Sequence, residues 1–242
     1  MSNQKVWYMD LAKQLDSLFY FFDLGFNEEN DFAYWFALNQ IKSEDRTPEQ
    51  DDEMWAYVQK GSKQQQRYRS FYPIDKSLLP ATMYVTFDYD RNTVLPDFFR
   101  IGGGYMIMSE RFANILKSHD LGKTQVIPIR FFDLVHHEYV NDTSYYLLNI
   151  VEKHQYFLPD LMNPKPYFVY AKDGIDIYRA AHTEAVHANY TYSDKALSCP
   201  VDLWAEPSLS GELYISDKLM KSLQQAGLTH LMDLWECQLL NQ

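Results

Sequence analysis

The sequence predicts an α+β fold with a mostly antiparallel or mixed sheet, and three observations lead to this prediction. Several short segments after residue 81 alternate between apolar and polar residues, as half-buried strands do. A strand–helix–strand pattern occurs twice. The composition is that of a folded chain, because 46% of its 242 residues are hydrophobic and 23% are charged, with only 9 Gly and 10 Pro. Such a chain can bury one large core, with or without an appended lobe.

The twofold pattern is an internal similarity between residues 102–122 and residues 209–229, which align without gaps. In each copy a short strand ends at a serine, Ser109 or Ser216, whose hydroxyl can cap the first amides of a helix. An acidic residue follows, near the positive end of the helix dipole. Gly227 can adopt the left-handed conformation that ends the second helix, and Asp120 stands at that place in the first. The shared residues are therefore those that make structure.

Further strands are predicted at residues 81–90, 124–133 and 144–152, and in two segments that start at residues 212 and 230. Pro128 should place its strand at a sheet edge or at a bulge, because proline lacks the amide hydrogen that a strand ladder needs. The segments PYFVYA and IDIYRAA flank Lys172, Asp173 and Gly174, which predicts a hairpin with an Asp-Gly turn.

The chain before residue 81 is more heterogeneous, and we predict that residues 1–80 form an N-terminal extension packed on a main domain of residues 81–242. Residues 5–9 have the composition of a strand. Residues 44–53 are strongly acidic, whereas residues 60–69 are basic and polar. Charge runs of this kind usually form exposed helix or loop, so a solvated face is the ordinary interpretation.

The charge balance narrows the classes of partner. There are 22 Lys and Arg against 33 Asp and Glu, for a formal charge of −11. Nucleic acid is an improbable partner, because affinity for it depends on phosphate neutralisation by Lys and Arg. An acidic protein is instead attracted to basic surfaces, among them the active sites of nucleases. The 19 Tyr and 15 Phe must be largely core, and Tyr also suits recognition surfaces.

The sequence also predicts a cytoplasmic location without a membrane partner. Asp10 and Asp16 interrupt the apolar run that a signal peptide would need. No apolar stretch reaches the roughly 18 residues that span a membrane. Cys199 and Cys237 lack metal-type spacing and lie far apart in sequence, so we expect free reduced thiols.

A search for catalytic, cofactor and metal motifs predicts none of the three. The glycines at 102–104 lead into a strand, which is the wrong context for a dinucleotide loop. His137 and Glu138 lack the second histidine of a zinc-protease motif, and His182 and His187 have a spacing that does not favour chelation. A diffuse active site, such as that of a metal-dependent hydrolase, is kept as a minor alternative.

If the chain acts by binding a protein, the acidic run beside aromatic residues is the candidate contact surface. Acidic side chains would speed capture of a basic partner, and a neighbouring aromatic ring would anchor it. The candidate residues are Glu49, Asp51, Asp52, Glu53, Trp55 and Tyr57.

The C-terminal copy of the repeat carries a resemblance to a known family. The order LPDFF, MIMSERFANIL, YYLLNIV, IYRAA and VDLWAEPSLSGELYISDKLMKSLQQAGLTHL resembles family eleven of the polymorphic-toxin immunity proteins, over roughly residues 95–240. The family pattern is filled by Ile215, Ser216, Asp217, Lys218, Leu219, Leu223, Ala226, Gly227, Leu228 and Thr229. His230 departs from the pattern, which favours Gly there, and this puts the local turn in doubt.

The resemblance implies a protein that protects a bacterium by binding a cognate toxin encoded nearby, and it brings no catalytic residues. Together with the acidic charge, it predicts an immunity protein that occludes a nuclease or another toxin with a basic site. A protein-interaction adaptor that has no toxin as its partner is the main alternative.

Overall fold

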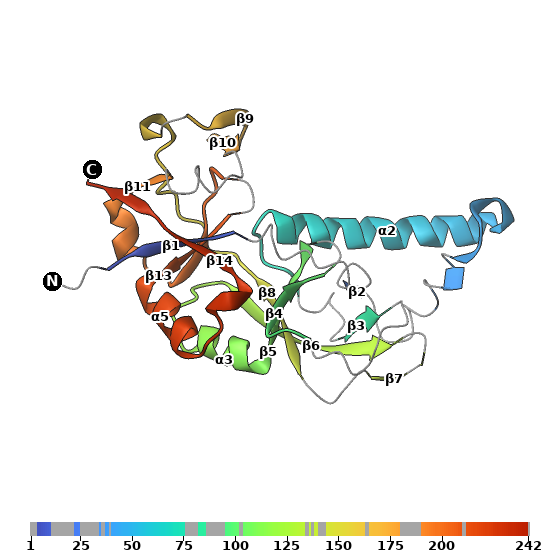
Figure 1. Cartoon of the computed structure of the whole chain (residues 1–242). Coiled ribbons are helices and arrows are strands. Elements are labelled where there is room, and N and C mark those ends of the chain that lie inside the picture. The colour runs from blue at the N-terminus through green and yellow to red at the C-terminus, as the bar shows by residue number, and fades with distance from the viewer. Residues whose placement is uncertain are drawn as a thin grey trace. The chain divides into compact units, whose positions relative to one another are not determined.

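The computed structural model describes residues 4–10, 22–24, 34, 37–38, 40–75, 82–85, 95–101, 104–133, 136, 138–139, 144–162, 165–179, 190–209 and 212–241 (Figure 1). The chain forms two compact units that interleave along the sequence. The first unit contains residues 1–14, 111–124 and 150–242, and the second contains residues 15–110 and 125–149.

The first unit is built on a four-stranded antiparallel sheet with the order β12-β13-β1-β14. Its strands are β1 (Val6–Asp10), β12 (Leu203–Ala205), β13 (Leu213–Ser216) and β14 (Asp233–Glu236). Strand β1 lies inside the sheet, because it pairs with β13 on one edge and with β14 on the other. Residues from the start of the chain therefore complete a sheet made near its end.

Two smaller sheets and two helices complete the described part of the first unit. Strands β11 (Thr191–Ser193) and β15 (Gln238–Leu240) pair in parallel, and β9 (Tyr167–Lys172) and β10 (Ile175–Arg179) form a hairpin. The helices are α3 (Glu110–Lys117), whose first residue lies in the second unit, and α5 (Asp217–Gln225). Short 3-10 helices cover Pro159–Leu161, Asp194–Ser198 and Thr229–Leu231.

The core of the first unit is rich in tyrosine, as the composition predicts. Tyr8, Tyr190, Tyr192, Tyr214 and Trp204 are each no more than 2% exposed. The hydroxyls of Tyr192 and Tyr214 lie 2.6 Å apart, and the Tyr214 hydroxyl donates to a Glu212 carboxylate oxygen at 3.3 Å. Burial raises the pKa of Tyr192 and of Tyr214 well above the ordinary value. These phenols therefore act as neutral hydrogen-bonding groups within an aromatic core.

The second unit contains a mixed sheet with the order β2-β3-β6-β8-β5-β4, and β7 also pairs with β6. Its strands are β2 (Phe22–Leu24), β3 (Thr82–Val85), β4 (Phe98–Arg100), β5 (Met106–Ser109), β6 (Gln125–Asp133), β7 (Glu138–Tyr139) and β8 (Tyr145–Asn149). Only the β3–β6 pair is parallel among the described strands of this sheet.

The position of Pro128 agrees with its missing amide hydrogen. Strand β6 pairs with β8 up to Ile129, and its pairing with β3 starts at Arg130. Among the described residues, Pro128 therefore has a partner strand on one side only, so β6 is locally an edge there.

Helix α2 (Pro48–Arg69) is attached to the sheet of the second unit at its C-terminal end. Thr47 caps its first turn in a reciprocal capping box with Gln50. Near the other end Tyr68 is buried, and its hydroxyl donates to the Leu148 carbonyl at 3.1 Å and accepts from the Met106 amide at 2.8 Å. The acidic and basic segments that the sequence predicts as helix or loop are thus mainly one exposed helix, preceded by a 3-10 turn at Ser43–Asp45.

The two repeat copies fold into the same local topology, which confirms the predicted fold class. In the second unit the order is β4-β5-β8-β6, and in the first it is β12-β13-β1-β14, with every neighbouring pair in these two sets antiparallel. The registers also correspond, because Phe99 faces Ile107 as Trp204 faces Tyr214. In both copies a helix directly follows the second strand of the set.

One detail of the predicted repeat is wrong. Gly227 has a φ of 70° and ends α5 as expected, whereas Asp120 is not in the left-handed region. The left-handed residue of the first copy is Gly122, with a φ of 54°. Glycine enters this region at little cost, whereas an aspartate needs a compensating contact. The Asp120 amide instead donates to the Asp202 carboxylate at 3.0 Å.

The division at residue 80, between an N-terminal extension and a main domain, stays a prediction. Strand β1 belongs to the predicted extension and lies inside the sheet of the first unit. Among the described residues, no helix combines the length and apolar character needed to cross a membrane.

Candidate functional site

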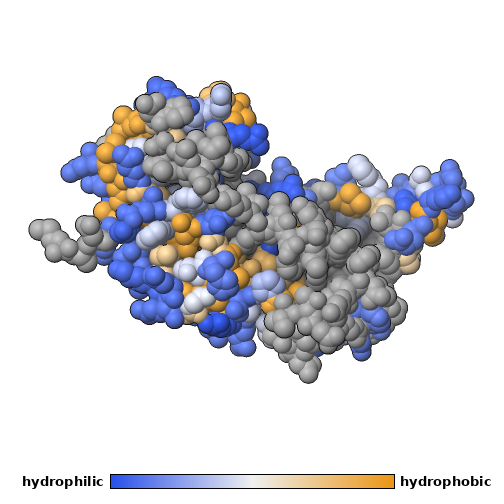
Figure 2. All heavy atoms as spheres, viewed as in Figure 1, coloured by the Kyte–Doolittle hydropathy of each residue, from blue (hydrophilic) through white to orange (hydrophobic). Residues whose placement is uncertain are grey.

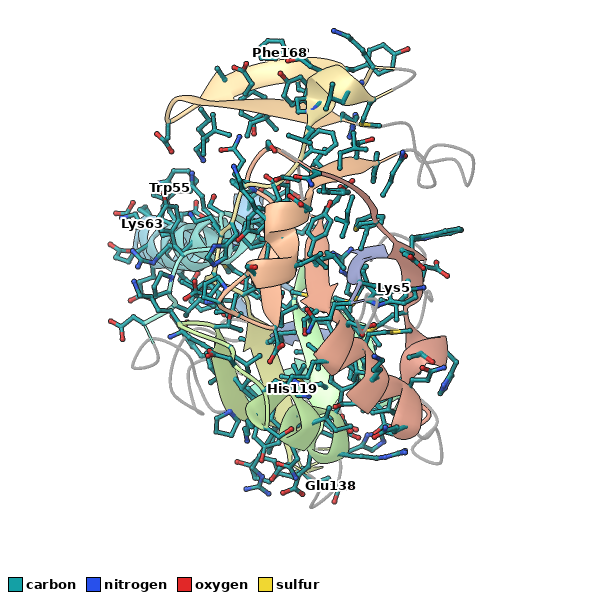
Figure 3. The ribbon with its side chains drawn as sticks, turned by 90° about the vertical axis from the view of Figure 1, so that its left-hand side faces the viewer. Lys5, Trp55, Lys63, His119, Glu138 and Phe168 are labelled. Carbon is teal, nitrogen blue, oxygen red and sulfur yellow. The ribbon has the colours of Figure 1, made fainter. Side chains whose placement is uncertain are left out.

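The six residues predicted to contact a partner lie on α2, in the second unit. Glu49, Asp51, Asp52 and Glu53 occupy the first turns of the helix, where negative charge is favourable at the positive end of the dipole, and all four are exposed. Trp55 is 65% exposed, whereas Tyr57 is half-buried. Figure 3 labels Trp55 on this helix, with Lys63 farther along it.

The helix brings only some of these residues together. Glu49, Glu53 and Tyr57 are spaced four apart, so they follow one face. Asp51 and Trp55 lie on the roughly opposite face, because a two-residue step on an α-helix turns by about 200°. Asp52 lies between these two groups, because a three-residue step leaves it about 60° from both Glu49 and Trp55. The predicted set is therefore spread around most of the helix and does not form one patch.

Three of the four carboxylates on α2 have hydrogen-bond or ion-pair partners within the chain. The Tyr34 hydroxyl donates to Glu53 Oε2 at 2.7 Å, and this hydrogen bond to a carboxylate raises the pKa of Tyr34. Arg46 Nη1 lies 3.6 Å from Asp51 Oδ1. The pKa of Glu49 is lowered by hydrogen bonds from its own backbone amide and from Thr47. Apart from the Arg46 side chain, which is only 14% exposed, these groups are at the surface, so water and salt screen their charges strongly.

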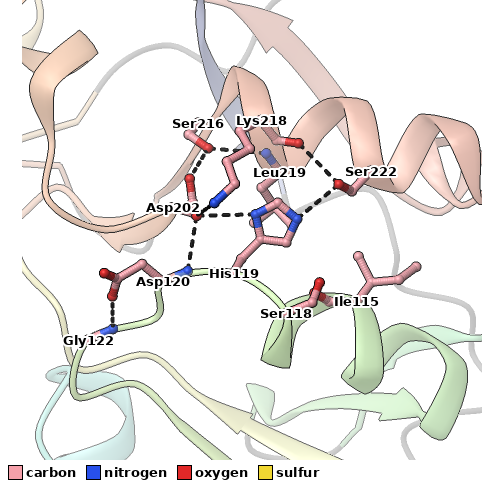
Figure 4. Close-up of polar contacts among 10 residues, drawn as sticks. All are labelled: Ile115, Ser118, His119, Asp120, Gly122, Asp202, Ser216, Lys218, Leu219 and Ser222. Atoms are coloured by element: carbon pink, nitrogen blue, oxygen red, sulfur yellow. Dashed lines mark hydrogen bonds and ion pairs between the residues drawn. The ribbon is translucent and has the colours of Figure 1, made fainter.

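A second cluster, which the sequence analysis missed, surrounds Asp202 in the first unit (Figure 4). The Ser216 hydroxyl donates to Asp202 Oδ1, and the same hydroxyl accepts from the Leu219 amide at 3.1 Å, which caps α5. On the other oxygen, Asp202 Oδ2 lies 3.1 Å from His119 Nδ1. The far nitrogen of that ring, Nε2, lies 2.9 Å from the Ser222 hydroxyl.

The order Asp202–His119–Ser222 is the order in which a carboxylate and an imidazole activate a serine nucleophile. The surroundings of these three residues favour a structural role for the hydrogen bonds instead. Ser222 also donates to the Lys218 carbonyl of its own helix at 3.3 Å, and its single hydroxyl hydrogen can serve only one acceptor at a time. The His119 side chain is only 3% exposed. The network joins the chain after α3, the start of β12 and helix α5.

The other repeat copy supports this structural interpretation. Asp97 directly precedes β4, as Asp202 directly precedes β12, and the Ser109 hydroxyl donates to Asp97 Oδ1. In both copies the serine amide also donates to the aspartate carbonyl, at 2.9 Å from Ser109 and 3.0 Å from Ser216. The Asp–Ser pair is thus a repeated feature of the fold.

A cavity of about 470 Å³ lies beside Asp202, and its lining includes Cys199 and three lysines but neither His119 nor Ser222. Each lysine is paired with a carboxylate: Lys5 with Glu236 at 2.5 Å, Lys218 with Asp202 at 3.4 Å, and Lys221 with Asp217 at 2.6 Å. These carboxylates offset the lysine charges, so the cavity is not a strongly cationic site.

Among the described residues, the remaining candidates for catalysis or metal binding do not form a catalytic arrangement. Glu138 lies in the two-residue strand β7, and its predicted companion His137 lies outside the described residues, as do His182 and His187. Cys199 and Cys237 are free thiols, as expected. Over the part of the chain that the structure describes, no group of three His, Cys, Asp or Glu side chains could hold a metal ion.

A third surface, also missed from the sequence, is the apolar strand β9. Every residue from Tyr167 to Lys172 is exposed, and four consecutive members of this strand are large and apolar. Soluble proteins rarely leave such a run uncovered unless it meets a partner. In the view of Figure 2, hydrophobic side chains reach the surface near the top of the picture, where Figure 1 labels β9 and β10.

These surfaces belong to a protein whose class the comparison with known families establishes. A model of the Immunity protein family (Imm11) matches residues 33–237. The match covers most of the chain, so this protein belongs to that family of immunity proteins. It starts well before residue 95, so the resemblance seen in the sequence was too short at its N-terminal side. Among curated proteins, none matches the chain.

Membership of the family supports an immunity role and implies a cognate toxin as the partner. The surfaces that a partner could contact are therefore of more functional interest than the polar cluster at Asp202. Two of them, the N-terminal half of α2 and strand β9, are exposed and carry large aromatic side chains.

Proposed function

We propose that this protein neutralises its cognate toxin in the cytoplasm by binding it in a one-to-one complex that covers the toxin's active site or substrate entry. The observation that carries the proposal is the family match over residues 33–237. Binding alone can achieve this result, because a tightly held partner excludes substrate without any bond being made or broken.

The charge of the chain supports a toxin with a basic site, such as a nuclease. A formal charge of −11 produces a long-range attraction for a positively charged cleft, and such attraction raises association rates at moderate salt. The exposed carboxylates of α2 offer one place where this attraction can act. The same charge disfavours nucleic acid as a direct partner.

The test is co-expression with the protein encoded by the neighbouring reading frame. We expect that protein to arrest growth when it is made alone, and this chain to restore growth when both are made. Purified together, the two should elute as one complex whose mass fits one copy of each. If the neighbouring protein is harmless by itself, or if growth is not restored, the toxin assignment is wrong and an adaptor role becomes the better proposal.

A hydrolase remains the competing class because of the order Asp202–His119–Ser222. Neutralisation by binding predicts that Ser222→Ala restores growth as well as the unchanged protein does. Neutralisation by catalysis predicts loss of rescue with the complex still formed, because a missing nucleophile stops turnover but leaves the binding surface intact. The second result would overturn the binding mechanism.

A further inference from the structure

Strand β9 presents its side chains to solvent although most of them are apolar. Tyr167 is 74% exposed, Phe168 58%, Val169 51% and Tyr170 50%. The sequence YFVY has the composition of a buried strand, so this exposure conflicts with the environment that such residues favour. Figure 3 labels Phe168 on the hairpin.

The hairpin is fixed through its other strand. The Tyr178 amide of β10 donates to the Ser208 carbonyl at 2.8 Å, and the Tyr178 ring packs edge-on against the buried ring of Phe157. Buried Glu206 in turn accepts from the Ser208 amide and from the Phe157 amide. Asp173 and Gly174 have φ values of 53° and 78°, which confirms the predicted tight turn. Strand β9 is therefore presented on an ordered support.

The outer edge of β9 is open within the described residues. Strand β9 pairs with β10 and with no other described strand, whereas β10 is bridged to Leu209 on its far side. Val169 is the extra residue of a bulge, because Tyr170 faces Ile177 and Phe168 faces Tyr178. An open edge with apolar side chains is a template on which another chain can add a strand.

Lysines at the two ends of this edge indicate what kind of strand fits it. Lys165, whose Nζ lies 3.3 Å from Asp160 Oδ1, precedes β9, and Lys172 ends it. A second copy that paired antiparallel about the centre of the YFVY run would place Lys165 opposite Lys172 twice, and like charges directly opposite are unfavourable. Residues 165–179 carry three basic and two acidic side chains, in contrast to the strongly acidic whole. The edge therefore suits a partner strand with an apolar centre and acidic ends.

We propose that β9 is a docking edge for the cognate toxin, which adds an extended strand of this kind and packs it against Tyr167, Phe168 and Tyr170. The inference rests on the proposed function for the identity of the partner. Backbone hydrogen bonds would supply general affinity, and the aromatic rings would act as anchors.

The direct test measures toxin affinity for variants of the full chain, with the neighbouring toxin made in an inactive form as the probe. We expect the double variant Tyr167→Ser/Tyr170→Ser to raise Kd by at least about 100-fold, because buried aromatic anchors dominate interfaces of this type. Val169→Lys should have a similar effect by placing a charge in the middle of the edge. Matched controls are Leu161→Ser and Leu197→Ser, which change exposed leucines of the same unit and should leave Kd within a factor of three.

Two further measurements distinguish strand addition from a contact made by side chains alone and from a loss of folding. Amide hydrogen exchange should slow in peptides covering residues 165–172 when the toxin binds, since new backbone hydrogen bonds would protect the edge. Unchanged melting temperatures of the variants, which alter only exposed side chains, would show that lost affinity is not lost folding.

The possible failures point to different conclusions. A double variant that binds as tightly as the unchanged chain would refute the docking edge and leave the proposed function standing. An unchanged chain that binds no toxin would refute both. A chain that forms a dimer which Val169→Lys dissociates would show that β9 pairs with a second copy, and this too overturns the inference.

Discussion

Four hydrogen-bond donors converge on the Asp202 carboxylate: the Ser216 hydroxyl, the Asp120 amide, the His119 ring and the Lys218 ammonium group. Burial alone would raise the pKa of this carboxyl, but the hydrogen bonds and the lysine charge outweigh it and hold the pKa below its ordinary value of 3.8. Folding therefore favours the ionised form of Asp202. Through these hydrogen bonds the carboxylate connects segments that are distant in sequence.

This linkage predicts a pH-dependent effect of Asp202→Asn. A carboxyl whose pKa is lower in the folded state stabilises the fold above its unfolded pKa, and this contribution is lost as the pH falls through the folded pKa. We expect the variant to lower the free energy of unfolding by about 1–3 kcal/mol at pH 7, because buried donors lose their acceptor. The difference from the unchanged protein should shrink by pH 3.

Urea denaturation of both proteins at pH 7 and pH 3 measures this difference. Asp160→Asn is the matched control, since the Asp160 side chain is 90% exposed and its ion pair with Lys165 lies at the surface. A penalty for Asp202→Asn that is equal at both pH values would mean that the charge of Asp202 is not what stabilises the fold.

Local sequence predicted some of these residues and not others. Ser216 and Gly227 were recognisable because a cap and a left-handed helix end each depend on neighbouring residues alone. The Asp97–Ser109 and Asp202–Ser216 pairs were missed because the second copy has two more residues between its aspartate and serine. A comparison without gaps therefore stops before it reaches the aspartates. His119 joins the cluster through the fold, which no local pattern reveals.

Among the elements, β1 shows most clearly how much depends on distant contacts. Its composition predicts a strand, but only the fold places it between β13 and β14. Tyr8 at its centre is 2% exposed, and its ring centroid lies 5.6 Å from those of Tyr190 and Tyr214. For strand β9 the sequence predicts the strand but not its environment. Its apolar composition is that of a buried strand, yet the folded chain leaves it exposed.

We expect Tyr8→Ala to lower the free energy of unfolding by about 3–5 kcal/mol, as removal of a large buried aromatic ring usually does. Tyr167→Ala is the matched control, because the same change on a ring that is 74% exposed should cost no more than about 0.5 kcal/mol. Chemical denaturation of the two variants compares them directly. Equal effects would mean that β1 contributes little to the stability of its unit.

For the whole molecule, net charge and family membership indicate its function better than any single motif does. The family match from residue 33 includes α2, although that helix carries little of the apolar pattern on which sequence comparison by eye depends. Its first turns contribute four of the 33 acidic residues, in a chain with 22 basic ones. If the toxin site is basic, this imbalance should govern how fast the two proteins meet.

The prediction concerns the quadruple variant Glu49→Gln/Asp51→Asn/Asp52→Asn/Glu53→Gln. We expect its association with the toxin to slow by roughly tenfold at low salt and to depend less on salt, because long-range attraction is screened by ions. Stopped-flow association at several salt concentrations measures both quantities. Circular dichroism is the control for loss of α2, whose first turn these acids also favour. An unchanged association rate would remove α2 from the contact surface.

The position of β1 also determines when during synthesis the sheet of the first unit can form. Val6 is made 210 residues before its partner Ser216, and β14 follows after that. At a synthesis rate of roughly 5–20 residues per second, the first strand waits on the order of 10–40 s for its neighbours. The central sheet of the first unit can close only when nearly all of this sequence has left the ribosome. A newly started chain therefore cannot contain the complete sheet until this delay has passed.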